Sequence, residues 1–202
     1  MLTQLAQAKY ADGTEPSVVD VVMVAAFLFG AGQDTTVRLL AASLRFLAED
    51  QALQTRLRKE RGRIPDFIEE VLRMDGPVKS DFRLVRSPVK IGDVAAEPGQ
   101  SVMLINAAIN RDPRKFEAPS QFNLDRKNAR EHVAFGRGIH ACVGSPLARA
   151  EARVSLERLF DRTSSIRIDD SKHGAAGSRN FEYEPSYIMR GLKELHLEVT
   201  PA

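Results

Sequence analysis

Apolar residues recur at helical spacing near the start of the chain. The series runs through Val18, Val21, Val22, Ala25, Phe29, Leu39, Leu40, Leu44 and Leu47. This period predicts one long helix that begins near Pro16, a residue suited to a first helical turn, and continues to about Asp50. Because its first half is apolar almost all round, we expect the helix to run through the middle of a domain. Gly30-Ala31-Gly32 is its weak point, since each glycine destabilises a helix by roughly 1 kcal/mol relative to alanine.

Shorter patterns complete the expected fold, which is mainly α with a minor β component. Helices are predicted over residues 51–61, 65–74 and 146–161. Short strands are predicted within residues 78–105, where FRLV, VKI and SVMLI are separated by turn residues. Residues 110–128 and 169–180 are predicted to be loops, and residues 187–200 a hairpin with Gly191 near its turn.

Composition and charge narrow the class of protein. Of the 202 residues, 43% are hydrophobic and 28% are charged, which is typical of a soluble globular chain. The net charge of +2 argues against nucleic-acid binding, which favours a concentrated basic surplus. The longest apolar stretch, residues 18–29, is short and carries Asp20, so we expect no membrane span. The N-terminus has no signal-peptide layout, and the expected location is the cytoplasm.

The single cysteine is the strongest candidate for chemistry. Cys142 lies in the loop FGRGIHACVG, where glycines let the backbone approach a flat ligand closely. Ser145-Pro146 follows as a plausible cap and first turn of the next helix. Amide N–H groups and the helix dipole at that position favour the thiolate, which is an axial ligand that haem iron accepts.

Two other interpretations of Cys142 remain open. A lone cysteine is most often a small buried hydrophobe. Alternatively, Cys142 could be a nucleophile with His140 as its base, although no oxyanion-hole or base-orienting pattern accompanies them.

The loop resembles the haem-binding loop of the cytochrome P-450 family in its soluble bacterial form. The resemblance rests on Phe135-Gly136-x-Gly138-x-His140-x-Cys142-x-Gly144. It implies haem b (iron protoporphyrin IX), with Cys142 as the iron ligand. The other residues that it implies at the haem are Phe135, Gly136, Arg137, Gly138, His140, Ala141, Gly144, Ala148 and Arg83. Of these, Arg83 and His140 correspond to donors to the haem propionates.

Other stretches agree with the resemblance in the family's order. Glu70-Val71-Leu72-Arg73 is similar to the Glu-x-x-Arg motif of helix K, whose i, i+3 spacing lets the two charges pair on one helix face. The resemblance adds Arg126 as the third member of this structural cluster. Asn110-Arg111-Asp112-Pro113 is similar to the family's turn ahead of the meander.

The long helix also carries a resemblance. Ala31-Gly32-Gln33-Asp34-Thr35-Thr36 is similar to the oxygen-activation motif of the family's helix I. This implies a catalytic pair in which Thr35 supplies a hydroxyl and Asp34 relays protons. On the residues alone, a mid-helix threonine often bonds back to the carbonyl four residues earlier, here Ala31. By position in the resemblance, the substrate-lining residues are Phe27, Gly30, Ala31, Val78, Ile188 and Met189.

The resemblance implies one domain portion over residues 1–202, the C-terminal haem-binding half of the family fold with helices I, J, K and L, a small sheet and a C-terminal hairpin. The expected function is a haem-thiolate monooxygenase that inserts one oxygen atom from O2 into an apolar organic small molecule. Electrons are expected from a ferredoxin or flavodoxin-type donor with its reductase, docked near the cations Arg137, Arg149 and Arg153. The alternative is a truncated, catalytically incompetent haem-binding or interaction fragment, since a complete family member is roughly twice this length.

Overall fold

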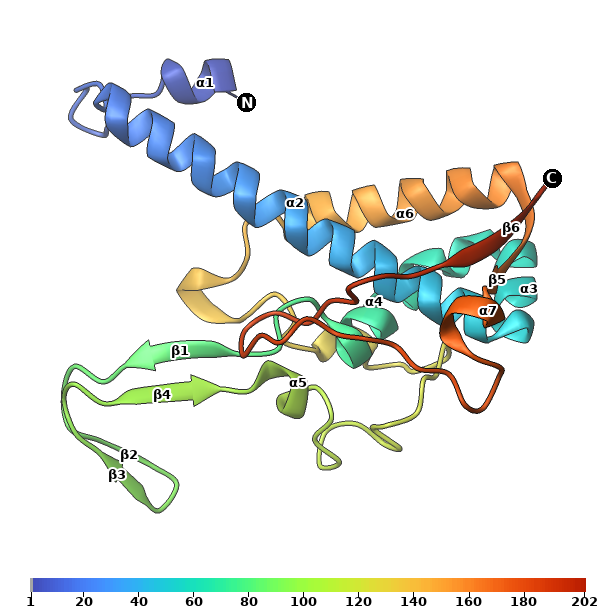
Figure 1. The fold of residues 1–202 in the computed structure, drawn as a ribbon. Coiled ribbons are helices and arrows are strands. Elements are labelled where there is room, and N and C mark those ends of the chain that lie inside the picture. The colour runs from blue at the N-terminus through green and yellow to red at the C-terminus, as the bar shows by residue number, and fades with distance from the viewer. Residues whose placement is uncertain (1) are drawn as a thin grey trace.

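Helix α2 dominates the computed structural model, which describes residues 2–202 (Figure 1). The helices are α1 (Leu2–Ala6), α2 (Val18–Glu49), α3 (Gln51–Lys59), α4 (Ile64–Asp75), α5 (Asn106–Ile109), α6 (Ser145–Arg162) and α7 (Asp170–His173). Single helical turns are η1 (Arg61–Arg63), η2 (Ala129–Glu131) and η3 (Gly138–His140). The strands are β1 (Asp81–Leu84), β2 (Val89–Ile91), β3 (Val94–Ala96), β4 (Ser101–Leu104), β5 (Thr163–Ile168) and β6 (Leu197–Pro201). The mainly α prediction with a minor β component is confirmed.

Both ends of α2 are set by short polar side chains. The hydroxyl of Ser17 accepts the N–H of Asp20 at 3.1 Å, which satisfies one of the free donors of the first turn. At the other end the carboxylate of Asp50 accepts the N–H of Leu53 at 2.9 Å and begins α3 at once. The predicted span of the long helix is therefore confirmed to within two residues at its start and one at its end.

The apolar first half of α2, which its pattern alone predicts in the middle of a domain, is exposed in the described residues. Val18, Met23, Phe27 and Phe29 are 79%, 66%, 72% and 71% exposed. Figure 1 shows this half projecting beyond the other elements, with α1 beside it. By length and composition alone α2 passes a test for membrane-spanning helices, as the core helices of globular proteins also do.

The second half of α2 does lie in the core. Its buried residues, together with those of α3, α6 and β5, pack against the apolar face of α4. The fully buried members of this core include Leu39, Leu47, Leu57, Ile64, Phe67, Ile68, Leu72, Leu156 and Ile166. Burying each such side chain contributes roughly 1.5–3 kcal/mol, so this cluster is the stable part of the chain.

Three antiparallel strand pairs lie around the helices. β1 pairs with β4 from Asp81↔Leu104 to Leu84↔Ser101, β2 pairs with β3, and β5 pairs with β6 from Thr163↔Pro201 to Ile168↔Leu197. The C-terminal hairpin is present, but residues 182–193 form it in place of residues 187–200. Gly191 lies in the paired part of this hairpin and not at its turn, since its carbonyl oxygen accepts the N–H of Glu184. The guanidinium of Arg38 occupies the space that a side chain at position 191 would need.

Two smaller predictions also change. Residues 169–180 contain the single turn α7 and are not wholly loop. Ser145 is the first residue of α6 and not its cap, since Gly144 holds the capping position with no side-chain bond.

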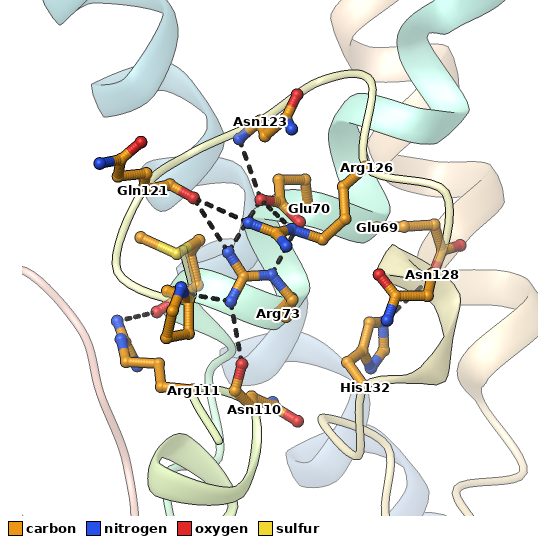
Figure 2. Close-up of polar contacts among 12 residues, drawn as sticks. Glu69, Glu70, Arg73, Asn110, Arg111, Gln121, Asn123, Arg126, Asn128 and His132 are labelled. Carbon is orange, nitrogen blue, oxygen red and sulfur yellow. Dashed lines mark hydrogen bonds and ion pairs between the residues drawn. The ribbon is translucent and has the colours of Figure 1, made fainter. Parts of the chain in front are cut away.

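Helix α4 buries two neighbouring carboxylates that point to different sides (Figure 2). Glu70 accepts Nε and Nη2 of Arg73 at 2.8 Å each and Nε of Arg126 at 3.0 Å. Arg73 also donates to the carbonyl oxygens of Asn110 and Pro119 at 2.9 and 2.8 Å. This fully buried network ties the irregular segment 110–128 to α4.

The second carboxylate, Glu69, binds two partners from elsewhere in the chain. Its oxygens accept Nε and Nη2 of Arg149 at 2.6 and 3.0 Å, and Nε2 of His132 lies 3.0 Å away. Burial raises the pKa of Glu69, but the hydrogen bonds from His132 and Arg149 outweigh it and lower the pKa from 4.5 to about 2. Glu69 therefore remains ionised and joins α4 to α6 and to the turn η2.

Loss of one partner of the Glu70 network is expected to destabilise the chain. In Arg126→Gln, Glu70 keeps its charge in a buried site with one cation fewer, so the free energy of unfolding should fall by roughly 3 kcal/mol, the lower end for a broken buried pair. Urea unfolding followed by circular dichroism measures this. Arg114→Gln is the matched control, because it removes an exposed pair with Asp112 and should leave the urea midpoint unchanged. Equal midpoints for the two variants would contradict the assignment.

The Glu69 cluster predicts an acid dependence of stability. Because the folded pKa of about 2 lies below the ordinary 4.5, its contribution is complete above pH 4.5 and is lost as the pH falls towards 2. Urea midpoints measured between pH 6 and pH 2.5 should fall less steeply in Glu69→Gln than in the parent chain. Parallel curves for the two proteins would show that Glu69 carries no such linkage.

Candidate functional site

The loop from Phe135 to Gly144 holds the only cysteine in a fixed backbone turn. The N–H of Cys142 donates to the carbonyl oxygen of Phe135 at 2.9 Å, which closes the loop on itself. Gly136 and Gly138 adopt φ values of 70° and 81°, a left-handed region that a side chain would strain. The glycines predicted to shape the loop are thus needed for its conformation.

The Cys142 side chain is exposed, which disfavours the interpretation as a small buried hydrophobe. The neighbouring apolar side chains Ile139, Val143 and Leu147 are also 98%, 86% and 61% exposed. Within residues 2–202 no hydrogen bond joins His140 to Cys142, so the structure offers no nucleophile–base pair. A soft sulfur donor among exposed apolar side chains is a surface suited to a flat apolar ligand.

Helix α2 carries the second group of candidate residues. Side chains added at Gly30 or Gly32 would meet no atom within 4 Å, so this stretch presents open backbone. The hydroxyl of Thr35 donates to the carbonyl oxygen of Ala31 at 2.7 Å, the back-bond expected of a mid-helix threonine. Since its proton is used there, the Thr35 oxygen remains available as an acceptor.

Asp34 is held by a partner one turn further along the same helix. Arg38 donates through Nε to Asp34 at 2.8 Å and through Nη2 to Glu184 at 2.6 Å. The Arg38 side chain is only 12% exposed, whereas that of Asp34 is 52% exposed. The acid is therefore fixed on one side and open to solvent on the other.

The residues implied at the haem propionates lie at the surface. In the described part of the chain, the guanidinium of Arg83 donates only to the carbonyl oxygen of Phe82 and contacts no carboxylate. His140 is exposed in the turn η3, and Arg137 donates to the carbonyl oxygen of Glu131 at 3.3 Å. In the described residues, Arg83 and His140 thus have N–H groups that no carboxylate of the chain accepts.

The candidate substrate-lining residues fall into two groups. Val78 and Met189 form an isolated antiparallel bridge, and the N–H of Lys79 donates to the carbonyl oxygen of Ile188 at 2.8 Å. These contacts hold Val78 and Lys79, which follow α4, against the C-terminal hairpin. Phe27, Gly30 and Ala31 are exposed on α2, and among residues 2–202 no hydrogen bond joins them to the first group.

The remaining predicted residues have different surroundings. Ala141 is exposed beside Cys142, Gly144 caps α6 and Ala148 is half-buried in its first turn. Arg149 is not a free docking cation, because Glu69 binds it in a bidentate pair. Arg153 pairs with Glu157 at 3.1 Å on the exposed face of α6.

Sequence reasoning missed the partners of Glu69. Glu69 is adjacent to the motif glutamate, and its partners His132 and Arg149 lie 63 and 80 residues away. No local spacing signals such pairs. The available signal is that Glu69, Glu70 and Arg73 lie close together on an amphipathic helix that must bury one side. Any of these charges on the buried side needs a partner from elsewhere in the chain.

The donor set of this chain fits a haem. Haem iron takes one protein thiolate, and Cys142 offers an exposed sulfur. The apolar macrocycle matches the exposed Ile139 and Val143, and its carboxylates match the unused donors of Arg83 and His140. A cluster of three or more His, Cys, Asp and Glu side chains able to hold a bare metal ion is absent from the described residues.

Comparison with known proteins agrees with this fit. CYP150A6 from Mycobacterium marinum, solved in its substrate-free form, is 55% identical and superposes with a TM-score of 0.96, covering 99% of this chain and 49% of that one. CYP109E1 from Bacillus megaterium, in complex with testosterone, is 35% identical with a TM-score of 0.87, covering 97% and 52%. Cytochrome P-450 144 of Mycobacterium tuberculosis is 36% identical over 98% of this chain and 43% of its own length.

The length of chain that these matches cover shows to which family the chain belongs. The chain spans about half the length of these relatives. A model of the family described as Cytochrome P-450 matches residues 1–164, well over half of the chain. This chain belongs to the cytochrome P-450 family, whose members use protoporphyrin IX haem iron.

Proposed function

We propose that this chain forms the haem-binding part of a haem-thiolate monooxygenase, with Cys142 as the residue that would bind the iron. The exposed sulfur in the closed loop between Phe135 and Gly144 is the observation that carries the proposal. Gly136 and Gly138 hold the loop in left-handed backbone conformations that a side chain would strain, and a Cβ added at Gly138 would meet no atom within 4 Å. When bound, the haem supplies O2 activation, and a thiolate ligand favours O–O cleavage.

The chain's own residues bind and orient the group. Cys142 would bind the iron, and the exposed apolar side chains of Ile139 and Val143 would pack against the apolar macrocycle and exclude water there. Arg83 and His140 would bind the two propionates through charge-assisted hydrogen bonds. The Glu70 network keeps the segment before the loop against α4, so that the loop starts from a rigid element.

Asp34 and Thr35 on α2 would deliver protons to the bound group. Asp34 takes a proton from solvent at its open side, while Arg38 holds its other oxygen in place. Thr35 accepts a hydrogen bond at its hydroxyl oxygen, because its proton is committed to Ala31. An acid next to a fixed hydroxyl acceptor suits proton delivery into an apolar site.

The proposed substrate is an apolar organic small molecule. Support comes from the candidate lining residues, which are apolar apart from their backbone, and from the testosterone that occupies the related CYP109E1 structure. The two electrons come from a ferredoxin or flavodoxin-type donor with its reductase. The proposed location is the cytoplasm, in keeping with the bacterial relatives.

A second candidate is a haem-binding or interaction fragment without catalysis. The exposure of the apolar first half of α2 favours it, because the candidate residues on that half lack a cover among the described residues. In this case the chain holds haem weakly by itself.

The carbon-monoxide spectrum of the reduced, haem-loaded chain tests the ligand. A thiolate ligand shifts the Soret band far to the red, and Cys142→Ser should abolish this shift because it removes the soft donor. Ser145→Ala is the control, since its side chain lies outside the loop, and it should retain the band. A red-shifted band in Cys142→Ser, or its absence in the parent chain, would refute the assignment of Cys142. A correct band that fades within one gel-filtration run supports the fragment.

The proton pair is tested by uncoupling. With the haem-loaded chain, O2 and a ferredoxin and its NADPH-dependent reductase as the electron source, Thr35→Ala should release more hydrogen peroxide per NADPH consumed, and Asp34→Asn should lower turnover by roughly 10²-fold, because each slows proton delivery. Thr36→Ala is the matched control, as its hydroxyl bonds Glu151 on α6 at 3.2 Å instead. The assignment fails when Thr35→Ala and Thr36→Ala give the same peroxide yield.

A further inference from the structure

Glu69 lies next to the motif residue Glu70 on α4 but contacts a different set of partners. Successive residues of a helix are about 100° apart, so two adjacent side chains cannot serve one site. Figure 2 shows Glu70 directed at Arg73 and Arg126, and Glu69 directed to the side of His132. The relative exposure of Glu69 is 2%, so its charge must be compensated by the groups that it touches.

His132 links Glu69 to the backbone just before the cysteine loop. Its Nδ1 accepts the N–H of Ala134 at 3.1 Å, so the ring proton resides on Nε2 and is donated to Glu69. With both nitrogens engaged and the ring buried, His132 has one orientation. Glu69 thereby fixes the backbone of residues 132–134.

Arg149 links Glu69 to the loop itself from the other side. It binds Glu69 through two nitrogens, and its guanidinium carbon lies 4.6 Å from the centre of the Phe135 ring. A planar cation over an aromatic face is attractive, so Arg149 favours one position of the Phe135 ring, and the centre of the His132 ring lies 6.1 Å from that of Phe135.

Phe135 connects these contacts to the sulfur-bearing residue. Its carbonyl oxygen accepts the N–H of Cys142 at 2.9 Å. In residues 2–202, the backbone of Cys142 makes one further hydrogen bond, in which its carbonyl oxygen accepts the N–H of Ser145. The position of Cys142 therefore depends on how firmly Phe135 is held.

We propose that Glu69, His132 and Arg149 are positioning residues that hold Phe135, and through its carbonyl the backbone of Cys142, in the conformation that presents the sulfur. This inference rests on the proposed function only where it concerns haem. Glu69 acts here as the common anchor of both supports, and the geometry requires no contact between these residues and the ligand.

Amide hydrogen exchange in the haem-free chain tests the first part. Glu69→Ala removes the anchor, and the peptide covering Phe135–Gly144 should exchange about tenfold faster, whereas the peptide covering β5 should change little. Arg149→Lys keeps the charge but loses the bidentate fork, so its effect should be smaller than that of Arg149→Ala. Glu157→Gln is the matched control, because it removes an exposed carboxylate from α6 without touching the cluster.

The outcomes separate positioning from general stability. Faster exchange confined to the loop supports the inference. Equal acceleration in the loop and in β5 shows a purely structural role, and unchanged exchange in the loop shows that other contacts hold it; either result overturns the inference.

The haem-loaded protein gives a second, spectroscopic measurement. In Glu69→Ala the reduced carbon-monoxide complex should show a broader thiolate-type Soret band with a growing fraction at the non-thiolate position, and Glu157→Gln should match the parent. A parent-like band in Glu69→Ala overturns the link to the ligand. When the parent itself gives no thiolate-type band, the proposed function fails, while the exchange experiment still decides on the positioning of Cys142.

Discussion

The burial of charge on helix α4 governs the path of the chain around it. Glu69, Glu70 and Arg73 are 2%, 0% and 0% exposed, and a buried charge without a partner is far too costly to keep. Arg73 satisfies Glu70 from within the helix, but the other partners arrive from 56, 63 and 80 residues away. The irregular segment, the turn η2 and helix α6 must therefore all converge on α4 for the charges to be compensated.

This convergence explains why a glycine-rich loop can have one conformation. The loop between Phe135 and Gly144 buries little, and its apolar side chains Ile139 and Val143 point to solvent. It begins three residues after His132 and ends at α6, and both His132 and Arg149 of α6 are bound to Glu69. Order is thus imposed from the two flanks, which leaves the sulfur of Cys142 exposed and yet fixed.

Sequence patterns predicted the elements better than their surroundings. The periods of α2, α4 and α6 gave their bounds to within two residues, and the i, i+3 spacing of Glu70 and Arg73 was sufficient to pair them. The apolar period of α2 could not reveal that its first half is exposed, because periodicity records a preference for burial and not what covers the helix. Likewise, Gly191 suggests a turn, whereas its absent side chain makes room for Arg38.

Arg38 couples candidate residues that the sequence treats as separate. Its largely buried guanidinium must satisfy its donors, and it does so with Asp34 on α2 and Glu184 on the C-terminal hairpin. The hairpin also carries Met189, which is bridged to Val78 after α4. Removing either carboxylate leaves Arg38 with one charged acceptor, so Asp34 and Glu184 both depend on this one guanidinium. Arg38 is therefore an electrostatic link between α2, which carries the candidate residue Asp34, and the hairpin, which carries the candidate residue Met189.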